Sequence, residues 1–139
     1  MSKVLVFGAF DGLHPGHIDF FKQARKFGDY LIVSVGTDKN VKKIKGKRPL
    51  FSQEERKDIV SSLKIVDEAI LGAEEDFYGH IKTIAPDVIC LGYDQWADEE
   101  DVKKNLESIG LLGVRVKRLL PYRSEKSKST YLKEHSVDF

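Results

Sequence analysis

Apolar residues fall along this chain in short, nearly continuous runs, separated by stretches in which they recur at helical spacing. Runs without polar alternation are typical of parallel strands that are buried on both faces of a sheet. We expect such strands at residues 3–8, 30–35, 66–71, 87–91 and 114–120. Helical spacing is clear at residues 16–27, 76–84 and 98–109. Strands and helices therefore alternate, which predicts an α/β fold: a three-layer α/β/α sandwich around a five-stranded parallel sheet.

Short polar and glycine motifs indicate where helices begin and end. Ser52 and Glu55 have the spacing of a capping box, in which each side chain accepts a hydrogen bond from the other residue's backbone. They predict a further helix from residue 52, and its residues expected to face the core are Ile59, Val60 and Leu63. Gly28 follows the first helical stretch, and we expect it to be the C-terminal cap.

Residues 39–48 form a strongly basic segment. The six cations are Lys39, Lys42, Lys43, Lys45, Lys47 and Arg48. Because the segment contains Gly46 and precedes Pro49, we expect a loop rather than a regular helix. It follows the carboxyl end of a strand, where open α/β sheets bind ligands. We therefore expect a mobile loop that closes on an anionic ligand.

The sequence VLVFGAFDGLHPGHIDFF, residues 4–21, passes from a strand through a glycine-rich turn into a helix. The first N–H groups of a helix have no internal partners, and the helix dipole favours negative charge there. His14 and His17 lie at this junction, and Gly16 between them lets an anion approach the backbone closely. The junction predicts a phosphate-binding site.

Six positions of this junction fit the signature G-x-F-D-x-x-H-x-G-H: Gly8, Phe10, Asp11, His14, Gly16 and His17. On these residues the chain resembles the small nucleotidyltransferases of the cytidylyltransferase-like family, over nearly its whole length. The resemblance implies one nucleotidyltransferase domain over residues 1–139, with a Rossmann-like fold of the HUP type. It also implies transfer of a nucleotidyl group from a nucleoside triphosphate to a phosphate-bearing acceptor, with release of pyrophosphate.

The loop after the fourth predicted strand has the makings of a site for a planar ring, because a carboxylate, an amide and two aromatic residues follow a strand end. Residues 91–95, LGYDQ, resemble the archaeal-type FAD synthetases letter for letter. Glycerol-3-phosphate cytidylyltransferases carry an Asp-Trp pair here, which Asp94 and Trp96 only approximate. We expect Gly92 and Asp94 to bind the nucleotide and Tyr93, Gln95 and Trp96 to bind the acceptor.

Two further segments resemble family motifs. RPLFSQEER, residues 48–56, is similar to the motif whose basic residues contact the nucleotide phosphates, which implies roles for Arg48 and Arg56, with Lys45 as a third. The resemblance thus implies that the basic segment closes on a triphosphate, with Lys45 and Arg48 on its outer phosphates. Residues 122–130 are similar to the Ser/Thr-rich turn before the last helix, although Ser127 and Lys128 depart from it. The implied nucleotide-binding residues of that turn are Arg123, Ser129 and Thr130.

The predicted site divides into three roles. The expected catalytic residues are His14, His17, Lys45 and Arg56. Besides the histidines, the nucleotide-binding set is Gly8, Ala9, Phe10, Asp11, Gly16, Arg48, Gly92, Asp94, Arg123, Ser129 and Thr130. Asp11 or Asp94 could hold Mg²⁺ or another divalent cation. A zinc site built from Asp11 and the two histidines lacks a convincing further ligand. His80 lies outside every motif and is expected to be a surface or packing residue.

The resemblance favours an FMN adenylyltransferase, which makes FAD and pyrophosphate from ATP and FMN. Alternatives of the same fold are a cytidylyltransferase for glycerol 3-phosphate and an adenylyltransferase for a sugar phosphate in polysaccharide synthesis. A nucleotide-binding sensor without activity is the alternative from another class. By analogy with the family we expect a homodimer.

Composition narrows the partners and the compartment. The net charge of +1 gives no case for nucleic acid or membrane binding. There is no apolar run long enough to span a bilayer, and the N-terminus leads directly into a strand without a signal-peptide pattern. The single cysteine, Cys90, lies in an apolar run and fits a reducing cytoplasm.

Overall fold

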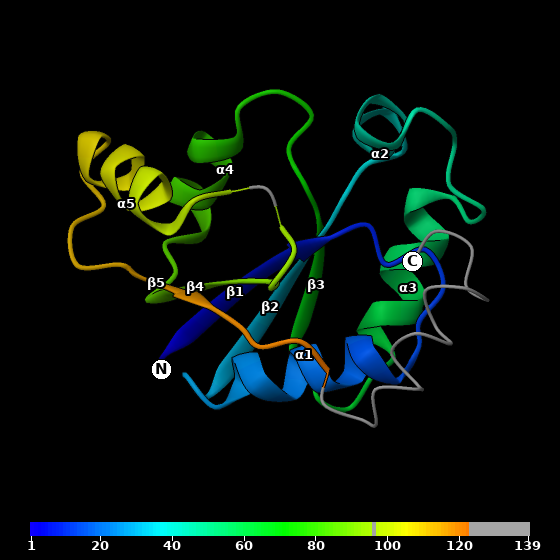
Figure 1. Ribbon diagram of the computed structural model, residues 1–139, viewed down its shortest axis with the longest axis horizontal. Helices are drawn as coiled ribbons and strands as arrows, with labels where there is room; N and C mark the ends of the chain where they lie inside the picture. Colours follow the sequence, from blue (N-terminus) through cyan, green and yellow to red (C-terminus); the bar gives the residue numbers. More distant parts are fainter. Residues whose placement is uncertain (96, 123–139) are drawn as a thin grey trace.

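A computed structural model describes residues 1–95 and 97–122 of the chain. Its sheet has five parallel strands in the order β3-β2-β1-β4-β5, which confirms the predicted Rossmann-like architecture (Figure 1). The strands are β1 (Lys3–Gly8), β2 (Tyr30–Val35), β3 (Glu68–Leu71), β4 (Val88–Leu91) and β5 (Arg115–Arg118). The helices are α1 (Pro15–Arg25), α2 (Asp38–Lys45), α3 (Gln53–Ser61), α4 (Phe77–Ile84) and α5 (Glu99–Ser108).

Helices cover both faces of the sheet, and the apolar side chains of β1 to β4 divide between two cores. On one face Val4 and Val6 of β1 join Phe21 of α1 and Val60 of α3. On the other face Leu5 of β1 belongs to a core with residues of α4 and α5. In Figure 1, α1 and α3 accordingly lie on one side of the sheet, and α4 and α5 lie on the other. Because neither side of the central strands meets water, their sequences are largely apolar, with Ser34 of β2 a buried polar exception.

The basic segment is helical through Lys45, so the expectation of a loop over residues 39–48 was wrong. Thr37 caps the start of α2, since its hydroxyl accepts a hydrogen bond from the Asn40 backbone. Gly46 ends the helix in the left-handed conformation, at φ +80°, and its N–H donates to the Lys42 carbonyl oxygen. Gly46 is thus a C-terminal cap, and the positive charges of the lysines in the last turn interact favourably with the negative end of the helix dipole.

Three smaller expectations also need correction. Helix α1 ends at Arg25 with Lys26 as its cap, so Gly28 is not the cap. Gly28 instead allows close chain contact, because a Cβ there would lie 2.5 Å from the Ser2 carbonyl oxygen. On α3, Val60 is buried but Ile59 is exposed. The edge strands β3 and β5 are shorter than predicted. Among the described residues, no helix is both long and apolar enough to cross a bilayer.

Candidate active site

A cavity of about 820 Å³ lies over the carboxyl ends of the strands. This is the edge at which open α/β sheets bind ligands, and the volume is within the usual range for a small-molecule site. Four glycines at or just after the ends of β1 to β4 line it: Gly8, Gly36, Gly72 and Gly92. Having no side chains, they leave space directly above the sheet. Strand order changes direction between β1 and β4, so the cavity spans the topological switch point.

His14 and His17 form the wall of the cavity at the start of α1. The Gly16 N–H donates to His14 Nδ1 at 3.0 Å, and the His14 N–H donates to His17 Nδ1 at 3.3 Å. The two residues thus make a capping box from histidines. Their rings stack with centroids 4.0 Å apart. Gly16 is required for this arrangement, because a Cβ there would lie 2.7 Å from the His14 ring.

These hydrogen bonds fix the chemistry of both rings. A ring nitrogen that accepts a hydrogen bond carries no proton, so each Nδ1 is bare and each neutral ring has its proton on Nε2. Burial lowers the pKa of His14. Burial, then the nearby His14, then the positive charge of Lys45, lower the pKa of His17 to about 4. At neutral pH the pair therefore offers two neutral Nε2–H donors at a helix N-terminus.

The lowered pKa of His17 predicts how stability depends on pH. Between about pH 6.5 and about pH 4 the unfolded chain holds a proton on this residue that the folded chain does not. The free energy of unfolding should therefore fall as pH is lowered through this window and stay level above it, as far as His17 is concerned. Urea denaturation at several pH values measures this, and His17→Asn, which has no titrating ring, should make the fall shallower. An equally steep fall in His17→Asn would contradict the assignment.

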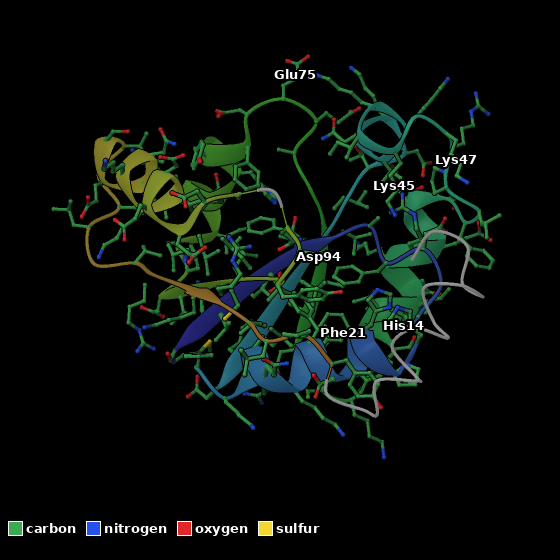
Figure 2. The ribbon with its side chains drawn as sticks, viewed as in Figure 1. His14, Phe21, Lys45, Lys47, Glu75 and Asp94 are labelled. Carbon is green, nitrogen blue, oxygen red and sulfur yellow. The ribbon has the colours of Figure 1, made fainter. Side chains whose placement is uncertain are left out.

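The basic side chains of the predicted site do not all reach the cavity. Lys45 lines it from the end of α2 and is close enough to influence His17. Figure 2 shows Lys45 at the end of α2, His14 at the start of α1 and Asp94 on the loop after β4. Arg48 is exposed on the loop after α2 and is not among the lining residues.

Arg56 lies inside the protein, with 0% of its surface exposed, and it does not line the cavity. Its guanidinium donates to the Ala9 carbonyl oxygen at 2.8 Å and to the Phe51 carbonyl oxygen at 3.0 Å. It also pairs with Asp38 at 2.8 Å. In this structure Arg56 therefore connects the β1–α1 loop, the start of α2 and the start of α3, which is the arrangement expected of a positioning residue.

Asp11 has a similar structural use. It is buried, and its carboxylate accepts hydrogen bonds from the Leu50 and Phe51 backbones at 2.6 and 3.0 Å. It does not line the cavity, whereas Asp94 does. Of the two metal candidates only Asp94 is therefore placed for a cation. In the part of the chain that is described, no three metal-ligating side chains converge. Mg²⁺ commonly binds one carboxylate together with substrate phosphates, so Asp94 fits such an ion.

Hydrogen bonds of Gln95 and Arg118 hold the loop after β4 in its conformation. The Gln95 amide donates to the Phe7 carbonyl oxygen at 2.9 Å and accepts from the Gly92 backbone at 2.7 Å. Arg118 of β5 donates to the carbonyl oxygens of Gly92, at 2.8 Å, and of Ala97. Gln95, expected to bind the acceptor, lines the cavity, and both polar atoms of its amide also hold the loop. Tyr93 is half exposed at the rim. No sequence motif pointed to Arg118.

The structure brings together most of the expected phosphate site and adds two residues. Gly8, Ala9, Phe10 and Gly16 line the cavity with the histidines. Trp96, Arg123, Ser129 and Thr130 lie outside the described residues. His80 was expected to be a surface or packing residue, but it lines the cavity, with its Nε2 3.1 Å from the hydroxyl oxygen of Ser34. Only the fold could reveal this pair, because 46 positions separate the two residues in sequence.

Comparisons with known proteins agree with this architecture. The family model described as cytidylyltransferase-like matches residues 5–135. An FAD synthase of Picrophilus torridus is 39% identical over 136 residues, which are 98% of this chain and 96% of that protein. An FAD synthase of Ferroglobus placidus is 50% identical over 111 residues, which are 80% of this chain and 72% of that protein.

Solved structures share the fold. The lipopolysaccharide core biosynthesis protein from Thermoplasma volcanium has a TM-score of 0.83 and 39% identity, over 88% of this chain and 98% of that one. A pantoate-β-alanine ligase from Francisella tularensis has a TM-score of 0.59 at 18% identity, over 91% of this chain and 61% of that one. The second similarity concerns the fold alone.

Proposed function

The chain belongs to the cytidylyltransferase-like family, and from that premise we propose that it transfers the adenylyl group of ATP to FMN, giving FAD and pyrophosphate. The protein is a nucleotidyltransferase, and the name shared by its curated relatives supports FAD synthesis. One observation carries the proposal on the structural side. The two histidines at the α1 N-terminus share a single cavity with aromatic walls, so a phosphate site adjoins a space suited to a flat ring.

The transfer is an in-line displacement at the α-phosphorus of ATP. A phosphate oxygen of FMN forms the new P–O bond, and the bond to the oxygen that bridges to the β-phosphate breaks, so its electron pair leaves with pyrophosphate. The acceptor is already an anion and needs no strong general base. Catalysis then rests on positioning and on donors aimed at developing charge.

Each cavity residue receives a role under this proposal. The Nε2–H groups of His14 and His17 donate to phosphate oxygens as charge moves toward pyrophosphate, and the backbone at the start of α1 adds further N–H donors. Lys45 holds the outer phosphates. A divalent cation such as Mg²⁺, held by Asp94 and phosphate oxygens, would neutralise triphosphate charge when bound. Gln95 and Arg118 hold the loop that carries Asp94 in place.

A sugar-phosphate adenylyltransferase is the second candidate, because the similar Thermoplasma volcanium structure is described as a lipopolysaccharide core biosynthesis protein. The cavity walls favour FMN over a sugar, since Phe7, Phe77, Val41 and Ile44 present apolar surface.

The compartment and the oligomeric state are further proposals. Cys90 is the single cysteine of the chain and is buried as a free thiol, which supports a reducing, cytoplasmic location. Homodimer formation is a proposal from family analogy, and light scattering tests it.

A pyrophosphate-release screen tests the proposed substrates. The purified protein, with Mg²⁺, is given ATP or CTP in turn with FMN, glycerol 3-phosphate or a sugar 1-phosphate. We expect ATP with FMN to give the highest kcat/KM, and riboflavin to be inert because it lacks the phosphate nucleophile. If CTP with glycerol 3-phosphate, or ATP with a sugar 1-phosphate, is faster than ATP with FMN, the acceptor assignment is wrong.

A further inference from the structure

Ser34 and His80 form a polar pair on the floor of the cavity, away from the histidines of α1. Ser34 lies near the end of β2 and is 3% exposed. His80 projects from α4, and its Nε2 lies 3.1 Å from the Ser34 hydroxyl oxygen. Both residues line the cavity. The reaction as described above gives neither residue any task.

The backbone packs closely against this pair. Gly72 follows β3 directly beside Ser34, and a Cβ there would lie 3.3 Å from the Ser34 hydroxyl oxygen. Any larger residue at this position would crowd the pair. Burial lowers the pKa of His80, so at neutral pH its ring is neutral and has one donor and one acceptor nitrogen. With the serine hydroxyl, the pair can both donate and accept toward a ligand.

The walls beside the pair are apolar and aromatic. The rings of Phe7 and Phe77 lie 5.0 Å apart between centroids, and both residues line the cavity. Val41 and Ile44 approach from α2, and Ile44 keeps 74% of its surface exposed. An apolar slot that ends in a donor-acceptor pair suits a flat ring system with one hydrocarbon edge and one heteroatom edge.

The strand order gives the cavity two sides, which could each hold the ring of one substrate. The strand order is β3-β2-β1-β4-β5, and α1 follows the central strand β1. The phosphate site at the α1 N-terminus is therefore in the middle, with Gly92 to Gln95 on the β4 side and the Ser34–His80 pair on the β2–β3 side. Two substrates that react through their phosphates would meet at the middle and extend their rings to opposite sides.

We propose that Ser34 and His80 bind the acceptor by hydrogen-bonding the heteroatom edge of its flavin ring, while Phe7 and Phe77 contact the apolar part. This inference rests on the proposed function and identifies the residues that select a flavin. The heteroatom edge of a flavin alternates carbonyl oxygens with a ring N–H, which matches a pair able to donate and accept. The sequence had suggested that Tyr93 and Gln95 bind the acceptor. Under this proposal the acceptor ring binds at Ser34 and His80 instead, and the nucleotide base binds at the loop of Tyr93 and Gln95.

Equilibrium binding separates this role from a structural one. Ser34→Ala and His80→Leu each remove a polar partner, and we expect the Kd for FMN, measured by quenching of flavin fluorescence, to rise about tenfold. The Kd for ATP should stay unchanged, and KM for FMN should rise more than kcat falls. His80→Gln, whose amide can replace Nε2, should bind FMN more tightly than His80→Leu. Lys82→Ala, at an exposed position of α4, is the matched control and should equal the wild type.

The outcomes distinguish this inference from the proposed function. If Ser34→Ala and His80→Leu are folded and bind FMN as tightly as the wild type, the inference is wrong while FAD synthesis still stands. Equal weakening of FMN and ATP binding also overturns it, since that would indicate a general structural role. A wild-type protein that neither binds FMN nor forms FAD overturns both.

Discussion

The His14→Asn and His17→Asn variants should each lose about 100-fold or more in kcat, with a much smaller change in ATP affinity. Asparagine keeps a side-chain acceptor close to the position of Nδ1, so the hydrogen bonds at the α1 N-terminus can persist. It cannot reach the position of Nε2, so it removes the donor aimed at the phosphates. Loss of one preorganised donor to developing charge typically costs about 10²- to 10³-fold.

Glutamine variants complete this test. Glutamine can place an amide N–H near the position of Nε2, so His14→Gln and His17→Gln should retain more turnover than the asparagine variants. Steady-state kinetics give kcat, and circular dichroism verifies the fold. Near-wild-type turnover in a folded His14→Asn or His17→Asn protein would remove that histidine from the mechanism. Asparagine variants that unfold instead would mean that the rings act mainly as caps.

Replacing Arg56 by methionine should destabilise the protein by about 3 kcal/mol. Arg56 is fully buried, and its loss leaves the carbonyl oxygens of Ala9 and Phe51 without their donor. Removing one partner from such a buried charged network typically costs about 3–5 kcal/mol. We expect a value at the lower end, because Asp38 keeps 44% of its side chain exposed and can be solvated.

Urea denaturation measures the effect against a matched control. Lys57 is the next residue of α3 and is exposed, so Lys57→Met should change stability by less than about 0.5 kcal/mol. The sequence-based interpretation of Arg56 as a phosphate contact predicts a different pattern. It requires Arg56→Met to fold with wild-type stability and to lose ATP affinity, and that result would refute the positioning role.

The sheet and the junction of β1 with α1 could be predicted because their signals are local. The apolar run Val4 to Phe7 is short, contains two valines and ends at Gly8, which together favour a buried strand over a helix. The cap made by Ser52 and Glu55 depends on residues within one helical turn, and the structure shows both of its hydrogen bonds. The position of Lys45 beside the histidines also agrees with the prediction.

Helix α2 was missed because glycine and clustered lysines occur both in loops and at the C-terminal ends of helices. Gly46 was interpreted as a sign of a loop, but glycine is equally the common residue one position past a helix end. A run of lysines repels itself in isolation, but at the last turn of a helix it opposes the helix dipole. Val41, which is buried, and Ile44, which is exposed, are the apolar residues of α2, and two positions are too few to establish a helical periodicity.

Several residues of the predicted site make long-range contacts that the sequence does not reveal. Arg56 bonds to Ala9 across 47 positions, and Gln95 bonds to Phe7 across 88. A motif marks such residues as important without showing whether they contact the substrate or the backbone. His80 has no motif and meets Ser34 only when α4 packs on the sheet. Sequence patterns thus identified many of the residues that line the cavity but not the contacts that they make within the protein.

Following the α-phosphate of ATP tests the central claim most directly. The protein is incubated with FMN, Mg²⁺ and ATP that carries radioactive phosphorus at the α position, and the flavins are separated by chromatography. If the adenylyl group moves to FMN, the label appears in FAD, and a parallel reaction with γ-labelled ATP leaves its label in pyrophosphate. Label that is absent from FAD while α-labelled CTP enters a glycerol 3-phosphate product would contradict the account.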